Sequence, residues 1–179
     1  PERLAKWRLA GENWRPLKTG VTRLSPSSVL IAVTGSLPAV QSDYDISYTV
    51  YGSGDVVISN RYTAGRDLPE LPRYGMQLVL PEAFDTFTWY GRGPHENYWD
   101  RKTGAAVGIY TGSVERQHVP YVEPQENGNK TDVRWAAVTN GDGIGLLAAG
   151  MPLLSVTAHE YTTHDLEIAG HPYDLIRRG

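Results

Sequence analysis

The segment YGRGPHENYWDR, residues 90–101, gathers side chains that could transfer protons or bind a polar ligand. Its charged or titratable members are Arg92, His95, Glu96, Asp100 and Arg101. A second polar segment, PYVEPQENGNKTD at 120–132, repeats the Glu-Asn pair, as QEN where the first has HEN. Glu96 and Glu126 are therefore the candidate acid and base, since glycoside hydrolysis requires two carboxylates about 5–10 Å apart.

A structural role for these carboxylates competes with the catalytic one, and we favour it. An irregular loop needs acceptors for its backbone N–H groups and a counter-charge for its arginines. Glu96 and Glu126 can supply both. Their arginine partners would come from the set Arg92, Arg101 and Arg134.

Other catalytic chemistry has weaker support in the sequence. His118 and Glu126 could shuttle a proton, as sugar epimerisation requires. No HxH or HExxH spacing links the histidines, and no GxSxG elbow is present, so we predict neither a metal site nor a serine nucleophile. Asp132 and Asp142 lie near glycines without completing a calcium-binding loop, and we interpret both as turn residues.

Composition limits the classes of function. The 179 residues carry a net charge of −3, which lacks the basic excess needed to bind nucleic acid or an anionic membrane. The chain has no cysteine, so cytoplasm and periplasm both remain open. No apolar run approaches the ~20 residues of a membrane span, and the first residues, PERLAKW, do not resemble a signal peptide. One domain over residues 1–179 is the expectation from length.

Aromatic residues are unevenly used, with 5 Trp and 11 Tyr against 2 Phe. Strand propensity is the favoured explanation, because Trp and Tyr are both common in sheets. The alternative is a sugar-stacking surface, since both rings combine an apolar face with a polar edge. The candidates for stacking on a sugar are Trp89, Tyr98 and Trp99.

Hydrophobic alternation predicts an all-β protein built from antiparallel strands, in a sandwich or barrel. Strands are expected at 27–37, 44–52, 56–65, two within 77–91 on either side of Pro81, 107–115, the hairpin 133–150 and 153–161. TNGDG, within that hairpin, supplies residues that tolerate positive φ. Short helices are expected over 2–11, stopped by Gly11, and from Thr162 or Thr163 to Gly170.

Several of these segments resemble the C-terminal, small-chain domain (domain 5) of the large family-2 β-galactosidases. They are KWRLAG (6–11), LPRYGMQLVLPEAFDTFTWYG (71–91), GRGPHENYWDR (91–101) and PYVEPQENGN (120–129). The resemblance implies an antiparallel supersandwich similar to the galactose-mutarotase fold. The signature positions of its two loops are Arg92, Glu96, Asn97, Tyr98, Asp100, Arg101, Tyr121, Pro124, Glu126 and Asn127.

The resemblance also implies where the chemistry lies. In that family the two catalytic glutamates of the retaining mechanism and the magnesium site belong to a (β/α)₈ barrel, so we expect no catalytic residue and no metal in this chain. The family's sugar-contacting tryptophan, in a Gly- and Asp-rich segment, has no match after His171. About the last third of the family domain is therefore expected to be absent.

The function expected from the resemblance is that of a non-catalytic domain of a β-galactosidase, which hydrolyses terminal β-D-galactose residues. It would shape the rim of the substrate pocket and support the barrel. The alternatives are a carbohydrate-binding module and, by fold analogy alone, an aldose 1-epimerase. Exposed strand edges also predict self-association of the chain.

Overall fold

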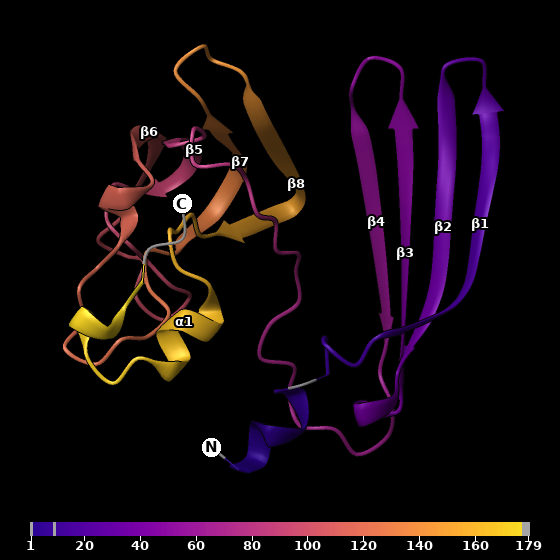
Figure 1. Ribbon diagram of the computed structural model, residues 1–179, viewed down its shortest axis with the longest axis horizontal. Helices are drawn as coiled ribbons and strands as arrows, with labels where there is room; N and C mark the ends of the chain where they lie inside the picture. Colours follow the sequence, from indigo (N-terminus) through magenta and orange to yellow (C-terminus); the bar gives the residue numbers. More distant parts are fainter. Residues whose placement is uncertain (1, 9, 177–179) are drawn as a thin grey trace. The chain divides into compact units, whose positions relative to one another are not determined.

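The computed structural model describes residues 2–8 and 10–176 (Figure 1). Their contacts divide the chain into two compact units, residues 1–77 and 78–179, and each is described by itself. Each unit contains one four-stranded antiparallel sheet, which confirms the all-β class. The expectations of one sandwich domain and of likeness to the mutarotase fold stay predictions.

The first unit is a simple meander in which each strand pairs with the next, in the order β1-β2-β3-β4 (Figure 1). Its elements are η1 (Glu2–Trp7), β1 (Arg15–Ser25), β2 (Ser28–Leu37), η2 (Pro38–Val40), β3 (Ser42–Tyr51) and β4 (Val56–Thr63). The turn between β3 and β4 contains Gly54 at a φ of +97°, a conformation that glycine adopts without steric cost.

Aromatic rings surround the small buried core of the first unit. Ala10, Leu37 and Val40 are buried there, with Trp7, Trp14, Tyr44, Tyr62 and Leu68 packed against them. The Trp14 indole donates a hydrogen bond to the Tyr44 carbonyl oxygen, 3.1 Å away. It lies so close to Gly35 that a Cβ there would collide with the ring. Tyr and Trp therefore serve in part as packing residues, as strand propensity suggests.

The second unit has the strand order β6-β5-β7-β8, so β5 and β7 lie at the centre. Its elements are β5 (Thr86–Gly93), β6 (Ala106–Ser113), η3 (Glu115–Gln117), β7 (Lys130–Thr139), β8 (Gly145–Val156), α1 (Thr163–Ile168) and η4 (Pro172–Asp174). The predicted helix after Thr162 is confirmed. Thr162 caps α1 through a capping box with Asp165, so the backbone N–H groups of the first turn find acceptors.

Three expectations about the strands and the first helix are wrong. The stretch 77–80 is not a strand, and its residues Leu78 and Val79 are 62% and 87% exposed. No described strand takes its hydrogen bonds, and Pro81 lacks an N–H. The stretch 153–161 is not a separate strand, because β8 runs through it only to Val156. The expected first helix is a 3₁₀ helix ending at Trp7, and residue 9 lies outside the described residues.

The sequence reasoning also missed β1, which pairs along its length with β2. Its apolar residues, such as Leu17 and Val21, are each 69% exposed and are interrupted by Lys18, Gly20 and other polar or small residues. The periodic signal is therefore weak. Pairing with β2 supplies the backbone hydrogen bonds that define the strand.

The core of the second unit lies on β5 and β7. Phe87, Trp89, Val133 and Ala136 are at most 5% exposed. The Phe87 and Trp89 rings stack with their centroids 4.9 Å apart. This packing holds the neighbouring strands β5 and β7 together. The polar loop with the HEN motif follows β5, and the polar loop with the QEN motif precedes β7.

Replacing Phe87 with alanine should lower the free energy of unfolding by about 3–5 kcal/mol, because a buried ring is removed and a cavity remains. Ile109→Ala is the matched control, since Ile109 lies on neighbouring β6 and is 66% exposed; its cost should stay below about 0.5 kcal/mol. Urea unfolding followed by circular dichroism measures both. Equal losses in the two variants would contradict the assignment of this core.

Candidate functional site

Two loops of the second unit contain the polar motifs. We name residues 94–102, after β5, the first signature loop, and residues 118–129, before β7, the second signature loop. Two hydrogen bonds join the loops. The Asn97 backbone N–H donates to the Asn129 carbonyl oxygen at 2.8 Å, and the Asn129 side-chain amide donates to the Asn97 carbonyl oxygen at 2.7 Å. The structure therefore brings together motifs that are about thirty residues apart in the sequence.

Glu96 is the acceptor that joins the two loops. Its carboxylate accepts hydrogen bonds from the Tyr121 hydroxyl, from the Gly128 backbone N–H at 2.8 Å and from the Tyr98 hydroxyl at 3.3 Å. The Arg101 guanidinium lies 3.2 Å from the same carboxylate and also donates to the Tyr121 oxygen at 3.0 Å. Three hydrogen bonds and one ion pair therefore converge on this carboxylate.

The electrostatics of this cluster follow from its donors. Burial by itself raises the pKa of Glu96, but the hydrogen bonds from Tyr121 and Gly128, with the charge of Arg101, outweigh burial and hold the pKa below its ordinary value. Burial, with the Glu96 charge, raises the pKa of Tyr98 to about 12. Glu96 is thus an ionised acceptor, and Tyr98 remains a neutral donor.

Gly128 makes the second loop compatible with this arrangement. Its φ is +74°, in the left-handed region that favours glycine. A Cβ at this position would lie 2.5 Å from the Gln117 carbonyl oxygen. The backbone N–H of Gly128 can therefore point to Glu96 only because no side chain is present.

The asparagines of the HEN and QEN motifs hold the backbone of each loop. Asn97 is 1% exposed; its amide donates to the carbonyl oxygens of Arg92 and His95, and its oxygen accepts from the backbone and hydroxyl of Thr131. Asn127 is 2% exposed and accepts from the Val119 N–H at 2.8 Å. Buried amides with all partners present fix one backbone conformation.

A second ionic cluster contains Arg92, Lys102 and Asp132. The Asp132 carboxylate lies 2.5 Å from the Arg92 Nε and 3.1 Å from the Lys102 ammonium. The hydrogen bond from Arg92 is the main reason that the pKa of Asp132 is below its ordinary value. The interpretation of Asp132 as a turn residue is wrong. It lies in an irregularity of β7 at a φ of +52°, whereas Asp142 does belong to the turn between β7 and β8.

The remaining signature residues differ in exposure. Asp100 is exposed and makes no side-chain hydrogen bond within the described part of the chain. Glu126 is exposed and accepts from the Thr163 hydroxyl, 3.3 Å away, whereas Pro124 is buried. The His118 ring packs at 5.5 Å from that of His159 and 5.1 Å from that of Tyr161. A proton-shuttling role for His118 and Glu126 stays a prediction.

The three candidates for stacking on a sugar differ in their access to solvent. Trp89 is 2% exposed and belongs to the core, so its ring faces Phe87 rather than a ligand. Tyr98 is partly buried, with the Arg101 guanidinium 4.4 Å from its ring centroid. Trp99 is 75% exposed, with the Lys102 ammonium 3.9 Å from its ring centroid. Trp99 is therefore the candidate whose ring is most available.

Sequence reasoning missed Lys102, Thr131 and Lys130 as members of this region. Lys130, the first residue of β7, is only 2% exposed, and burial lowers its pKa to about 8. The sequence signal that could have indicated these residues is the polar run NKTD directly before an apolar strand. That run resembles an ordinary polar loop until the fold buries it.

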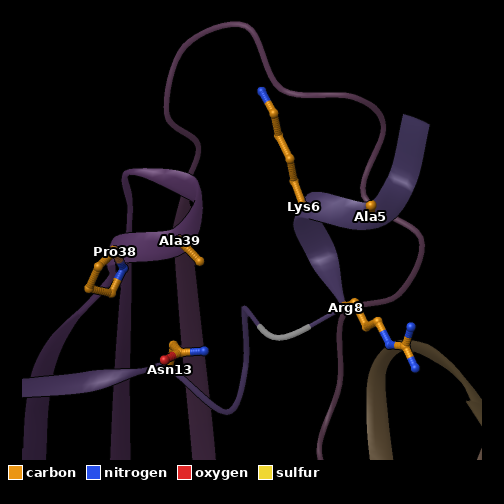
Figure 2. Close-up of a pocket in the computed structure, with 6 residues that line it drawn as sticks. All are labelled: Ala5, Lys6, Arg8, Asn13, Pro38 and Ala39. Carbon is orange, nitrogen blue, oxygen red and sulfur yellow. The ribbon is translucent and has the colours of Figure 1, made fainter. Parts of the chain in front are cut away.

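Outside the signature loops, a hollow lies in the first unit. It has a volume of about 530 Å³ and is lined by Ala5, Lys6, Arg8, Asn13, Pro38 and Ala39. Figure 2 shows the Lys6 and Arg8 side chains pointing away from one another, so the two cations do not converge on one ligand group. Among the described residues, no three or more His, Asp or Glu side chains are grouped to hold a metal ion. Nor is any described helix long and apolar enough to cross a membrane.

Replacing Glu96 with glutamine should lower the free energy of unfolding by about 1–3 kcal/mol at pH 7, because an amide nitrogen would face buried donors. The pKa of Glu96 is lowered in the folded state, so the stabilisation by its charge is complete above the ordinary value of 4.5 and is lost as the pH falls through the lower, folded-state value. The difference between wild type and variant should shrink over that acidic range.

Urea titrations from pH 7 to pH 3 measure this difference. Glu123→Gln is the control, since Glu123 is exposed in the same loop. A pH-independent difference between wild type and Glu96→Gln would contradict the role of the charge.

Comparison with known proteins places this arrangement in a family. A family model described as "Beta galactosidase small chain" matches residues 1–179. The β-galactosidase of Priestia megaterium is 42% identical over 174 residues, 97% of this chain and 17% of that protein. That of Lactobacillus delbrueckii subsp. bulgaricus is 34% identical over 173 residues, 96% of this chain and 17% of that protein. The chain, which spans less than a fifth of these relatives, belongs to the β-galactosidase small-chain family.

Proposed function

We propose that this chain is a non-catalytic accessory domain of a β-galactosidase that hydrolyses terminal β-D-galactosides. The observation that carries the proposal is the internal use of Glu96. In the first signature loop, the Glu96 carboxylate is ionised, accepts hydrogen bonds from Tyr98, Tyr121 and Gly128, and forms an ion pair with Arg101. A general acid or base needs a free position toward its substrate.

The finer role that we propose has two parts. The signature loops would support the catalytic barrel of the parent enzyme, and exposed side chains such as Trp99 would form part of the substrate-pocket rim. In support, buried asparagine amides and ion pairs fix the backbone of both loops. Their exposed side chains are therefore already positioned in the unbound chain. The catalytic glutamates and magnesium of the family-2 mechanism would belong to the barrel.

A chimera tests this proposal. The β-galactosidase of Priestia megaterium would carry this chain in place of its matching 174 residues. We expect the chimera to hydrolyse a chromogenic galactoside and the isolated chain to be inactive, because the reacting carboxylates lie outside it. Turnover by the isolated chain that disappears in Glu126→Gln would refute the accessory role, and so would a folded chimera that lacks activity while the parent enzyme is active.

Carbohydrate binding by the chain itself is the second candidate, favoured by the 75% exposure of the Trp99 ring. If Trp99 stacks on a sugar, lactose should shift its indole NMR signal in a saturable way, and Trp99→Ala should abolish the binding. Tyr173→Ala is the control, since Tyr173 is 80% exposed in η4. An unchanged spectrum with lactose in large excess would leave only the accessory role.

Self-association is a further proposal for the isolated chain. The outer strands β6 and β8 carry exposed apolar residues, including Ile109 at 66% and Leu147 at 62%. An edge strand with unpaired backbone groups and apolar side chains favours pairing with another chain.

A further inference from the structure

His159 lies after β8 and binds the second signature loop through one ring nitrogen. Its Nε2 is 3.0 Å from the Asn127 carbonyl oxygen, which can only accept, so the neutral ring carries its proton on Nε2. The other nitrogen, Nδ1, is buried, and no described residue forms a hydrogen bond with it. The site therefore suits a neutral imidazole and offers no acceptor to a second N–H.

Asn127 contacts a second histidine through its side chain. Its Oδ1 accepts from the Val119 N–H at 2.8 Å, and its Nδ2 donates to the Gln125 carbonyl oxygen at 2.9 Å, so the orientation of the amide is fixed. The same Nδ2 lies 3.5 Å from His118 Nδ1, which can accept from it only when unprotonated. Both histidines thus meet Asn127 in a way that favours neutral rings.

The electrostatic surroundings also favour neutral His159. Burial is the main cause that lowers the pKa of His159, and the hydrogen bond to the Asn127 carbonyl oxygen opposes burial without reversing the shift. The His118 ring centroid is 5.5 Å from that of His159, so charge on both rings would be unfavourable. The titratable groups around His159 come from the second signature loop, β7 and the segment after β8: His118, Glu126, Lys130 and Tyr161.

We propose that His159 is a pH-sensitive switch, which keeps the second signature loop closed while its imidazole is neutral and opens the loop when it takes up a proton. By closed we mean that the hydrogen bonds of Asn127 and Gly128 are intact. Protonation would place an N–H at the buried Nδ1, where no described residue accepts it. Moving the ring toward water relieves this cost, and the hydrogen bond to Asn127 is lost with that movement.

The effect on the loop follows from the position of Asn127 in the chain. Asn127 directly precedes Gly128, whose backbone N–H donates to Glu96 at 2.8 Å. A displaced Asn127 would withdraw this hydrogen bond, which joins the two signature loops. The pKa of Glu96 lies below its ordinary value of 4.5, so Glu96 is still ionised where histidine titrates. Opening by His159 is therefore separate from the titration of Glu96.

Amide hydrogen exchange of the 179-residue chain, read by NMR between pH 7.5 and pH 5, tests the switch. The closed loop disfavours the proton on His159, so loop opening should increase as the pH falls below the ordinary histidine value of 6.5. Protection factors of the Gly128 and Val119 amides, corrected for intrinsic exchange, should fall by up to about tenfold per pH unit, the limit for one proton. The Ala136 amide, in central strand β7, should keep its protection.

His159→Gln is the variant that isolates the switch. A glutamine amide can donate to the Asn127 carbonyl oxygen from near the position of Nε2, but it takes up no proton in this range. The variant should keep its protection at pH 7.5 and lose more than half of the acid-induced fall, measured on a logarithmic scale. His164→Gln is the matched control, because His164 is exposed in α1, and it should behave as wild type.

The wild-type chain gives a second measurement that does not depend on the folding of a variant. The ring ¹⁵N signals of His159 at pH 7.5 should show a proton on Nε2 and a bare Nδ1, and the ring should titrate below pH 6.5. A proton on Nδ1 or a titration midpoint at 6.5 or above would overturn the inference. So would constant protection of Gly128 in the wild type, or a smaller loss than expected in His159→Gln. None of these results bears on the accessory function, because no galactoside enters the experiment.

Discussion

A carboxylate withdrawn from water must find its hydrogen bonds inside the protein, and Glu96 is where this requirement shapes the second unit. Its side chain is 10% exposed, and its three hydrogen-bond donors and the Arg101 guanidinium that pairs with it come from both signature loops. To meet them, the second loop must place a backbone N–H at Gly128 and a hydroxyl at Tyr121 on the same small group. The geometry of the loops follows from the cost of leaving that charge unpaired.

The other polar contacts extend the same constraint to the sheet. Asn97 joins the first loop to Thr131 of β7, and Asp132 holds Arg92 of β5 and Lys102 of the first loop. These contacts use groups that would otherwise suggest catalysis. Glu96 and Asp132 thus act as structural anchors, which is consistent with a family whose small chain matches only part of a much longer enzyme.

Parts of the fold were accessible from sequence because they depend on local chemistry. The ends of β3 and β4 were predicted to within two residues, and the Gly- and Asn-containing turn between β7 and β8 was predicted, although β8 continues to Val156. Thr162 marked the start of α1 because a capping box needs only residues three apart. The stretch 77–80 was misassigned because its alternation has the period of a strand, yet a strand exists only where a neighbour accepts its backbone hydrogen bonds.

The sequence alone determined the all-β class, the family and the two loops that carry its motifs, since these depend on periodicity, turn residues and specific strings of residues. Tertiary structure decided which acidic residue has its partners within the chain, that Trp89 is buried while Trp99 is exposed, that Asp132 pairs with Arg92 and Lys102, and that Lys130 is buried. The physical reason is that burial and pairing depend on residues distant in sequence. Glu96 and Glu126 have similar sequence surroundings. Only the folded chain gives Glu96 three hydrogen-bond donors and an ion pair with Arg101, and leaves Glu126 at the surface.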